Sequence, residues 1–186
     1  MNFDSTPVNV TRGRSFCNIR NGPALKWRHT AGPAVCIYEE NMANEMISAP
    51  CPETGGIWHA HRVSYGETDT MGVLYYAEYM HIFERARSTL IRERGMSYSE
   101  VEKRGIYLPV REAYCRYRSP ARYDDLIFVR AWISEWRRAS VTFSYELYAE
   151  NKETLLATGM TQHAVVDPRG RPTAVPGWLK EQLMRP

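Results

Sequence analysis

Asp69 is a carboxylate in a short polar turn that comes directly before an apolar, helix-forming stretch. The turn, Glu67 to Gly72, is rich in residues that hydrogen-bond to their own backbone, and it contains a glycine. A helix start leaves about four N–H groups unpaired and carries roughly half a positive charge, so it can hold a developing oxyanion without a cationic side chain. The alternative is that Asp69 only caps the helix or stabilises the turn.

The stretch after the turn has the period of an amphipathic helix. Its apolar residues fall on one helical face and are Tyr75, Tyr79, Ile82, Phe83, Ala86 and Leu90. Gly95 is a typical helix terminator, and His61 to Tyr65 has the pattern of the end of a strand. We therefore expect Asp69 on the loop between a strand and a long helix.

Beyond this helix the sequence predicts four antiparallel strands. The apolar alternation shifts parity between Val110 and Ala113, which indicates a bulge near Arg111. Leu126 to Trp136 and Val141 to Ala149 should form a hairpin, and Leu155 to Val166 the last long strand. Asp167-Pro168-Arg169-Gly170 predicts a closing turn, and a short helix is expected after Pro176. The order predicts an α+β fold, with one sheet wrapped around one long helix.

The segment from Tyr65 to Arg87 resembles a known enzyme family. It reads Asp69-Thr70-x-Gly72-Val73-x-Tyr75, then Tyr79, then Phe83-Glu84-x-Ala86-Arg87. This combination resembles the 4-hydroxybenzoyl-CoA thioesterase branch of the hot-dog-fold acyl-CoA thioesterases, over roughly His59 to Val175. The resemblance implies a hot-dog fold and hydrolysis of an acyl-CoA thioester to free acid and CoA, with no cofactor.

The resemblance also implies roles for individual residues. The family's carboxylate at the Asp69 position is catalytic, as nucleophile or as general base for water. Its oxyanion hole is a backbone N–H at the start of the central helix, which here lies at or near Tyr76. The residues that we expect to bind substrate lie in the turn and at the predicted hairpin tip; they are Gly72, Val73, Tyr75, Arg137, Arg138 and Ser140.

The two arginines are the expected contacts for the CoA phosphates, because guanidinium forks suit phosphate geometry. A charged hairpin tip can equally be only a solvated turn. Tyr76 stands where many tol-pal-associated bacterial members, which the chain resembles closely, carry histidine and where the aromatic-acyl enzymes carry tyrosine. Its side chain can be an orienting hydroxyl, a pocket wall or simple packing.

Other ionisable residues are candidates for a site beside Asp69. Glu84 lies on the predicted helix, where other hot-dog branches keep a catalytic glutamate, but an ion pair with Arg85, Arg87 or Arg111 is the simpler reading. His59 and His61 should point to one face of a strand, and without a third ligand no metal site is expected. The four cysteines have no spacing typical of zinc or a disulfide framework.

Composition fits an ordinary globular enzyme. The chain has 186 residues, 44% of them hydrophobic and 24% charged, with a net charge of +3, which argues against nucleic-acid binding. No apolar run reaches the ~20 residues of a membrane span, and we expect a cytoplasmic protein.

The chain is expected to divide into two parts. Residues 1–56 lack periodicity and are expected to be an irregular or disordered extension, of which residues 1–41 could be an artefact of start-codon choice. Residues 57–186 are expected to form the enzyme domain.

A single sheet of this kind has an exposed edge, and the family joins two such sheets edge to edge, which implies a homodimer or homotetramer with sites between subunits. Two other functions stay open at the level of the sequence. One is a binding module that holds an acyl-CoA or a protein partner without turnover. The other is a thioesterase that acts on acyl-carrier protein.

Overall fold

The computed structural model describes residues 56–185, so the expectations for residues 1–55 lie outside the described part of the chain. These residues form one antiparallel sheet of five strands in the order β1-β3-β4-β5-β2. The elements are β1 (Ile57–Arg62), η1 (Tyr65–Glu67), α2 (Glu78–Glu93), α3 (Tyr98–Lys103), β2 (Val110–Tyr117), β3 (Leu126–Arg137), β4 (Ser140–Tyr148), β5 (Leu155–Ala164) and α4 (Gly177–Leu183). The predicted strand, helix and four further strands are confirmed.

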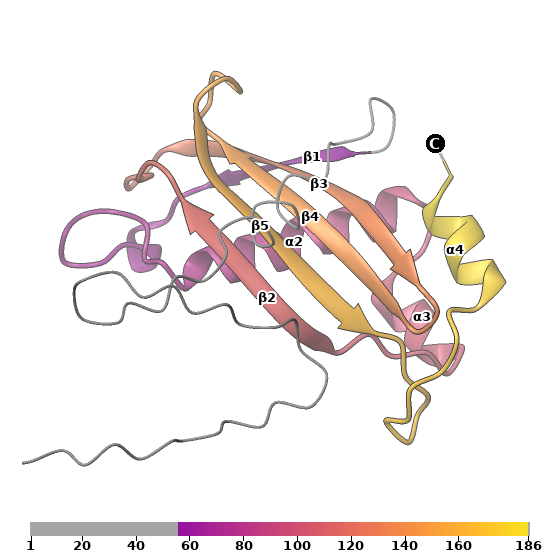
Figure 1. The fold of residues 1–186 in the computed structure, drawn as a ribbon. Coiled ribbons are helices and arrows are strands. Elements are labelled where there is room, and N and C mark those ends of the chain that lie inside the picture. Colours follow the sequence, from indigo (N-terminus) through magenta and orange to yellow (C-terminus); the bar gives the residue numbers. More distant parts are fainter. Residues whose placement is uncertain (1–55, 186) are drawn as a thin grey trace, which may run out of the picture. The chain divides into compact units, whose positions relative to one another are not determined.

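Helix α2 lies across one face of the sheet (Figure 1). The helical positions predicted as apolar are buried from Tyr79 onwards, and the Phe83 ring stacks on Tyr145 with the ring centroids 4.5 Å apart. Gly159 on β5 makes this contact possible, because a Cβ atom at that position would collide with the Phe83 ring. Gly95, with φ of 79°, follows the helix as predicted.

The predicted start of the helix was wrong by one turn. Helix α2 begins at Glu78, and Tyr75 is 40% exposed rather than part of the core. The Tyr75 N–H donates outside the helix, to the Glu67 carbonyl oxygen at 2.8 Å, and so ties Tyr75 back to the preceding turn. The chain is therefore held in a turn until the Glu78 N–H donates to the Tyr75 carbonyl oxygen.

The strand predictions hold with small shifts at the ends. Strand β3 pairs with β4 as a hairpin, and the register of β2 against β5 shifts between Val110 and Glu112, which confirms the bulge. Strand β1 ends at Arg62 instead of reaching Tyr65, because the chain turns there into the 3-10 helix η1. Helix α3 was not predicted, although Ser97 and Glu100 form a capping box at its start.

Strand β2 lies at the edge of the sheet, beside β5 alone. Seven of its residues are exposed within one chain, including Val110 and Tyr117. An edge strand presents unpaired N–H and C=O groups on its free side, which makes it a template for pairing with another strand. This edge, like that of β1 at the other side of the sheet, is a place where the sheet could be extended.

Candidate active site

The Asp69 turn is built by its own backbone. The Asp69 N–H donates to the Val73 carbonyl oxygen at 2.9 Å, and the Gly72 N–H donates to the Asp69 carbonyl oxygen at 2.9 Å. Gly72 has φ of 71°, a conformation that favours glycine. Val73 bridges to Arg122 on the neighbouring loop. The turn thus holds Asp69, Gly72 and Val73 together at one end of the sheet, before α2 (Figure 1).

The Asp69 side chain is half-buried, and its two oxygens differ in their surroundings. Oδ1 accepts a hydrogen bond from the Met71 N–H at 2.8 Å, so the carboxylate does stabilise the turn. The other oxygen accepts no hydrogen bond from any residue in the range 56–185. One oxygen therefore orients the carboxylate, and the second is left to meet a substrate or a water.

The start of α2 provides a free amide next to this carboxylate turn. Within the described part of the chain, the N–H groups of Tyr76 and Ala77 donate to no acceptor, whereas those of Tyr75 and Glu78, on either side of this pair, are both engaged. The carbonyl oxygen of Tyr76 accepts from the Tyr117 hydroxyl at 2.9 Å. Strand β2 therefore helps to fix the segment that carries this free N–H.

Four tyrosines surround the helix start. The rings of Tyr75 and Tyr76 are 4.5 Å apart, and Tyr79 meets Tyr117 edge-on at 4.9 Å. The Tyr76 hydroxyl, and to a lesser degree the negative charge of Asp69, raises the pKa of Tyr75. Burial raises the pKa of Tyr117, which keeps its hydroxyl a donor to the Tyr76 carbonyl oxygen. Four tyrosine rings with their hydroxyls, three of them from the same loop and helix start, thus lie at the α2 end of the Asp69 loop.

Glu67 lies just before the turn and is 8% exposed. Its carboxylate accepts hydrogen bonds from the Ser64 N–H at 2.8 Å and from His61 Nε2 at 2.9 Å, and it pairs with Arg85 Nη1 at 3.1 Å. Burial by itself would raise the pKa of Glu67, but these hydrogen bonds outweigh it and lower the pKa to about 2. From the sequence, Glu67 was only the first residue of the polar turn, although Ser64 and Glu67 have the spacing of a capping box.

Glu84 is exposed on α2, and its predicted ion pair was wrong. Its Oε1 accepts from the Ser88 hydroxyl at 2.9 Å. The candidate arginine partners are engaged elsewhere, with Arg85 on Glu67 and Arg111 on Glu112. Glu84 is therefore an exposed carboxylate in the second turn of the helix, not part of the Asp69 turn.

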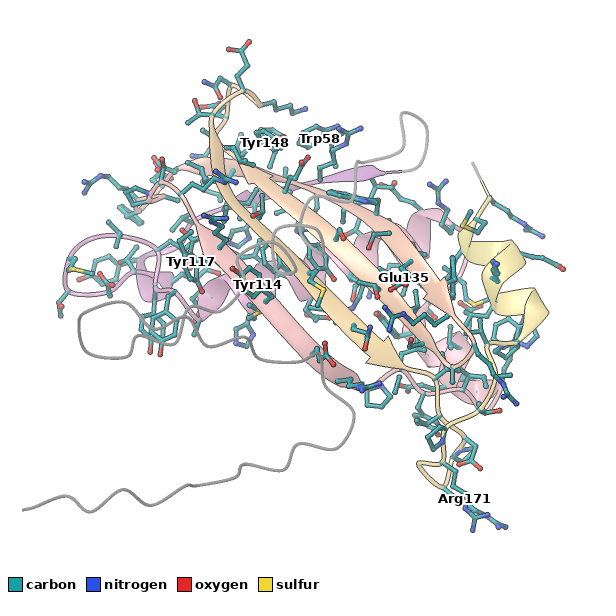
Figure 2. All side chains as sticks on the ribbon, viewed as in Figure 1. Trp58, Tyr114, Tyr117, Glu135, Tyr148 and Arg171 are labelled. Carbon is teal, nitrogen blue, oxygen red and sulfur yellow. The ribbon has the colours of Figure 1, made fainter. Side chains whose placement is uncertain are left out.

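The hairpin residues lie far from Asp69 within one chain. Strand β3 starts beside Arg62, close to the Asp69 turn, and ends at Arg137, roughly 35 Å away at 3.3 Å per residue. Figure 2 shows this separation between Tyr117, near the turn, and Glu135, near the far end of β3. Arg137 Nε contacts Glu135 at 2.9 Å, and Arg138 is exposed. Ser140 is buried, so its hydroxyl is not part of an exposed tip.

His59 and His61 do point to one face, towards α2, as predicted. His59 Nδ1 lies 3.1 Å from the Thr89 hydroxyl, and His61 joins the Glu67 cluster. Across residues 56–185, no group of three or more His, Cys, Asp or Glu side chains is arranged to hold a metal ion. Nor does that part of the chain contain a helix long and apolar enough to cross a membrane.

A sheet of five antiparallel strands with a long helix, α2, across one face is the hot-dog fold of known thioesterase structures. The model of the thioesterase-like superfamily matches residues 63–183. The chain therefore belongs to the thioesterase-like superfamily.

Individual proteins agree with this assignment. The acyl-CoA thioester hydrolase YbgC of Escherichia coli O6:H1 is 34% identical over 117 residues, which cover 62% of this chain and 86% of that protein. The solved structure of the DHNA-CoA thioesterase from Staphylococcus aureus is 30% identical with a TM-score of 0.63, over 68% of this chain and 87% of that one. A 4-hydroxybenzoyl-CoA thioesterase structure, 21% identical, shares the fold with a TM-score of 0.64 over 71% of this chain and all of that chain (100%).

Proposed function

We propose that the protein hydrolyses an acyl-CoA thioester to the free acid and CoA, with Asp69 as the catalytic carboxylate and the Tyr76 N–H as the oxyanion donor. One observation carries the proposal. A carboxylate with one unengaged oxygen and a backbone N–H with no acceptor lie on the two ends of a single short loop, 69–76, within residues 56–185. The names of the relatives described above support the same reaction.

In this mechanism the thioester carbonyl oxygen accepts the Tyr76 hydrogen bond. Asp69 either attacks the carbonyl carbon itself or takes a proton from the water that attacks it. A C–O bond forms, and the negative charge on the carbonyl oxygen is held by the N–H. Collapse of the tetrahedral species breaks the C–S bond, so CoA leaves as the thiolate. Water supplies the second oxygen of the acid, directly or by hydrolysis of an acyl-aspartyl anhydride.

The Tyr76 side chain is assigned a minor part, because the oxyanion donor belongs to the backbone. We expect Tyr76→Phe to keep kcat/KM within about threefold of the wild type, which corresponds to less than about 0.7 kcal/mol. Steady-state thiol release with one acyl-CoA measures this. A loss of more than tenfold would instead give the hydroxyl a direct role in the reaction.

The same proposal predicts a dimer formed through β2. Val110 pairs with His163, and Ser140 pairs with Ala164, so the β3–β4 hairpin lies at the end of the sheet where β2 begins. The Asp69 loop lies at the other end, since Tyr117 contacts Tyr76. Antiparallel pairing of two β2 strands sets the start of one beside the end of the other. Each Asp69 loop then comes towards the hairpin of the second subunit.

Arg137 and Arg138 are then expected to bind the CoA phosphates across the dimer. We expect the double variant Arg137→Ala/Arg138→Ala to raise KM for acyl-CoA about three- to tenfold with kcat unchanged, because exposed charged contacts contribute modestly. An acyl-pantetheine thioester, which lacks the nucleotide phosphates, should show no such change. Arg62→Ala, which removes another exposed arginine, is the matched control. An equal KM for wild type and double variant would show the hairpin to be only a solvated turn.

The experiment that tests the function is thiol release from short-chain, long-chain and aromatic acyl-CoAs, with the same acyl groups on acyl-carrier protein in parallel. Turnover of acyl-CoA is expected, and the panel identifies the acyl class. Turnover only on the carrier protein would replace the donor in the proposal. Stable binding without thiol release would contradict hydrolysis and make the protein a binding module.

A further inference from the structure

We propose that Glu67 is a positioning residue that fixes the Asp69 carboxylate and the Tyr76 N–H in their positions relative to each other. This inference rests on the proposed hydrolysis. The Glu67 side chain does not contact the reacting atoms, and it is not available for proton transfer to a substrate, since it is buried against its own partners. Its role comes from the elements that its hydrogen bonds connect.

The Glu67 carboxylate joins three elements. Oε2 accepts from the Ser64 N–H at the start of η1 and contacts His61 Nε2 on β1, at 2.8 and 2.9 Å. Oε1 accepts from Arg85 on α2 at 3.1 Å. The strand before the turn and the helix after it are therefore connected through one side chain, and only 11% of that side chain is exposed. Charge-assisted bonds of this kind are stronger than neutral ones.

The main chain of Glu67 completes the connection. Its carbonyl oxygen accepts from the Tyr75 N–H at 2.8 Å, and Tyr75 directly precedes the free N–H of Tyr76. Asp69 follows Glu67 by two residues. Both groups assigned to the reaction are thus within two residues of an atom that Glu67 fixes. A shift of Glu67 would move the carboxylate and the oxyanion donor relative to each other.

The hydrogen-bond partners assign a consistent protonation pattern to the cluster. His61 Nδ1 lies 3.3 Å from Arg85 Nη1, which can only donate, so Nδ1 is the acceptor and the ring proton is on Nε2. That proton is then donated to Glu67. A neutral His61, an ionised Glu67 and Arg85 satisfy all three contacts. Glutamine at position 67 would bring an NH₂ group towards groups that are all donors.

Glu67→Gln is therefore the sharpest test. We expect kcat to fall about 10- to 100-fold with KM within twofold, because a displacement of about 1 Å at reacting groups can cost on the order of 10²-fold. A purely structural role would leave kcat unchanged in the folded protein. The matched control is Asp124→Asn, since Asp124 also pairs with an arginine, Arg62, and its left-handed φ of 66° tolerates asparagine. This control should keep both constants.

Arg85→Ala gives a second test that does not depend on how well Glu67→Gln folds. The Arg85 side chain is 46% exposed, so its loss should leave the fold intact, and we expect a three- to tenfold fall in kcat, with recovery in Arg85→Lys. Wild-type kcat in folded Glu67→Gln or in Arg85→Ala, together with an inactive Asp69→Asn, would overturn the positioning role alone. A fully active Asp69→Asn would instead overturn the proposed function.

Discussion

Asp69→Asn should lower kcat for acyl-CoA hydrolysis about 10²- to 10⁴-fold, the range that a positioned acid–base group contributes. The amide has nearly the shape of the carboxylate, and its oxygen can still accept from the Met71 N–H, so the turn should keep its conformation. It can neither attack a thioester nor take a proton from water. Thiol release at saturating acyl-CoA measures the loss, and an unchanged melting temperature shows that folding is intact.

The control for this prediction is the rival carboxylate on the helix. Glu84→Gln removes a charge from an exposed side chain whose observed contact is the Ser88 hydroxyl, and we expect kcat within about twofold of the wild type. If Glu84→Gln loses turnover and Asp69→Asn keeps it, the catalytic carboxylate is on α2 and the mechanism given above is wrong.

Arg87→Ala should have the largest effect on stability. Arg87 is 6% exposed, and its guanidinium donates to the hydroxyls of Tyr98 at 2.6 Å, Tyr145 at 3.1 Å and Thr161 at 3.4 Å. Within residues 56–185 it makes no ion pair with a carboxylate. Alanine would leave a cavity and remove a hydrogen bond from the half-buried Tyr98 hydroxyl and from the buried Tyr145 and Thr161 hydroxyls, although the latter two keep their bond to each other. We expect a loss of about 2–5 kcal/mol in the free energy of unfolding.

Thermal or urea unfolding measures this loss. At roughly 2–4 °C per kcal/mol for a chain of this length, the melting temperature should fall by about 4–20 °C. Arg92→Ala, on an exposed site in the last turn of the same helix, should cost less than about 1 kcal/mol. Equal stabilities of the two variants would show that the hydroxyl cluster around Arg87 contributes little to the fold.

The parts of the fold that depend on local periodicity could be predicted from the sequence. The buried face of α2, the β3–β4 hairpin and the bulge beside Val110 follow from the spacing of apolar residues along the chain. The start of α2 could not be predicted in this way. Tyr75 fits the helical period, but its N–H is taken by Glu67, eight residues earlier, and period alone carries no sign of that bond.

The candidate site was predicted in part for the same reason. Asp69, Gly72, Val73, Tyr75 and Tyr76 are close in sequence, so one loop brings them together. Arg137 and Arg138 are far from that loop in the sequence, and they are also far from it in a single folded chain. Only a contact between two subunits could join them to it, and the sequence of one chain gives no direct sign of the geometry of such a contact.

The clusters of Glu67 and Arg87 needed the three-dimensional structure. Each combines side chains from elements distant in the sequence, such as His61 with Arg85, or Tyr98 with Tyr145. From the sequence, the arginines of α2 look like surface charges on a helix that is rich in Glu and Arg. The fold shows instead that Arg85 reaches the base of the Asp69 turn and that Arg87 is buried under the sheet.

The most direct test of the central claim is to incubate wild type and Asp69→Asn with an equimolar acyl-CoA that the panel identifies as a substrate, and to determine the bound and free species by native mass spectrometry. The wild type should yield free acid and CoA, with no intact thioester left, whereas folded Asp69→Asn should hold intact acyl-CoA. Intact acyl-CoA on the wild type, or complete hydrolysis by Asp69→Asn, would contradict the assignment of Asp69 as the catalytic carboxylate of a thioesterase.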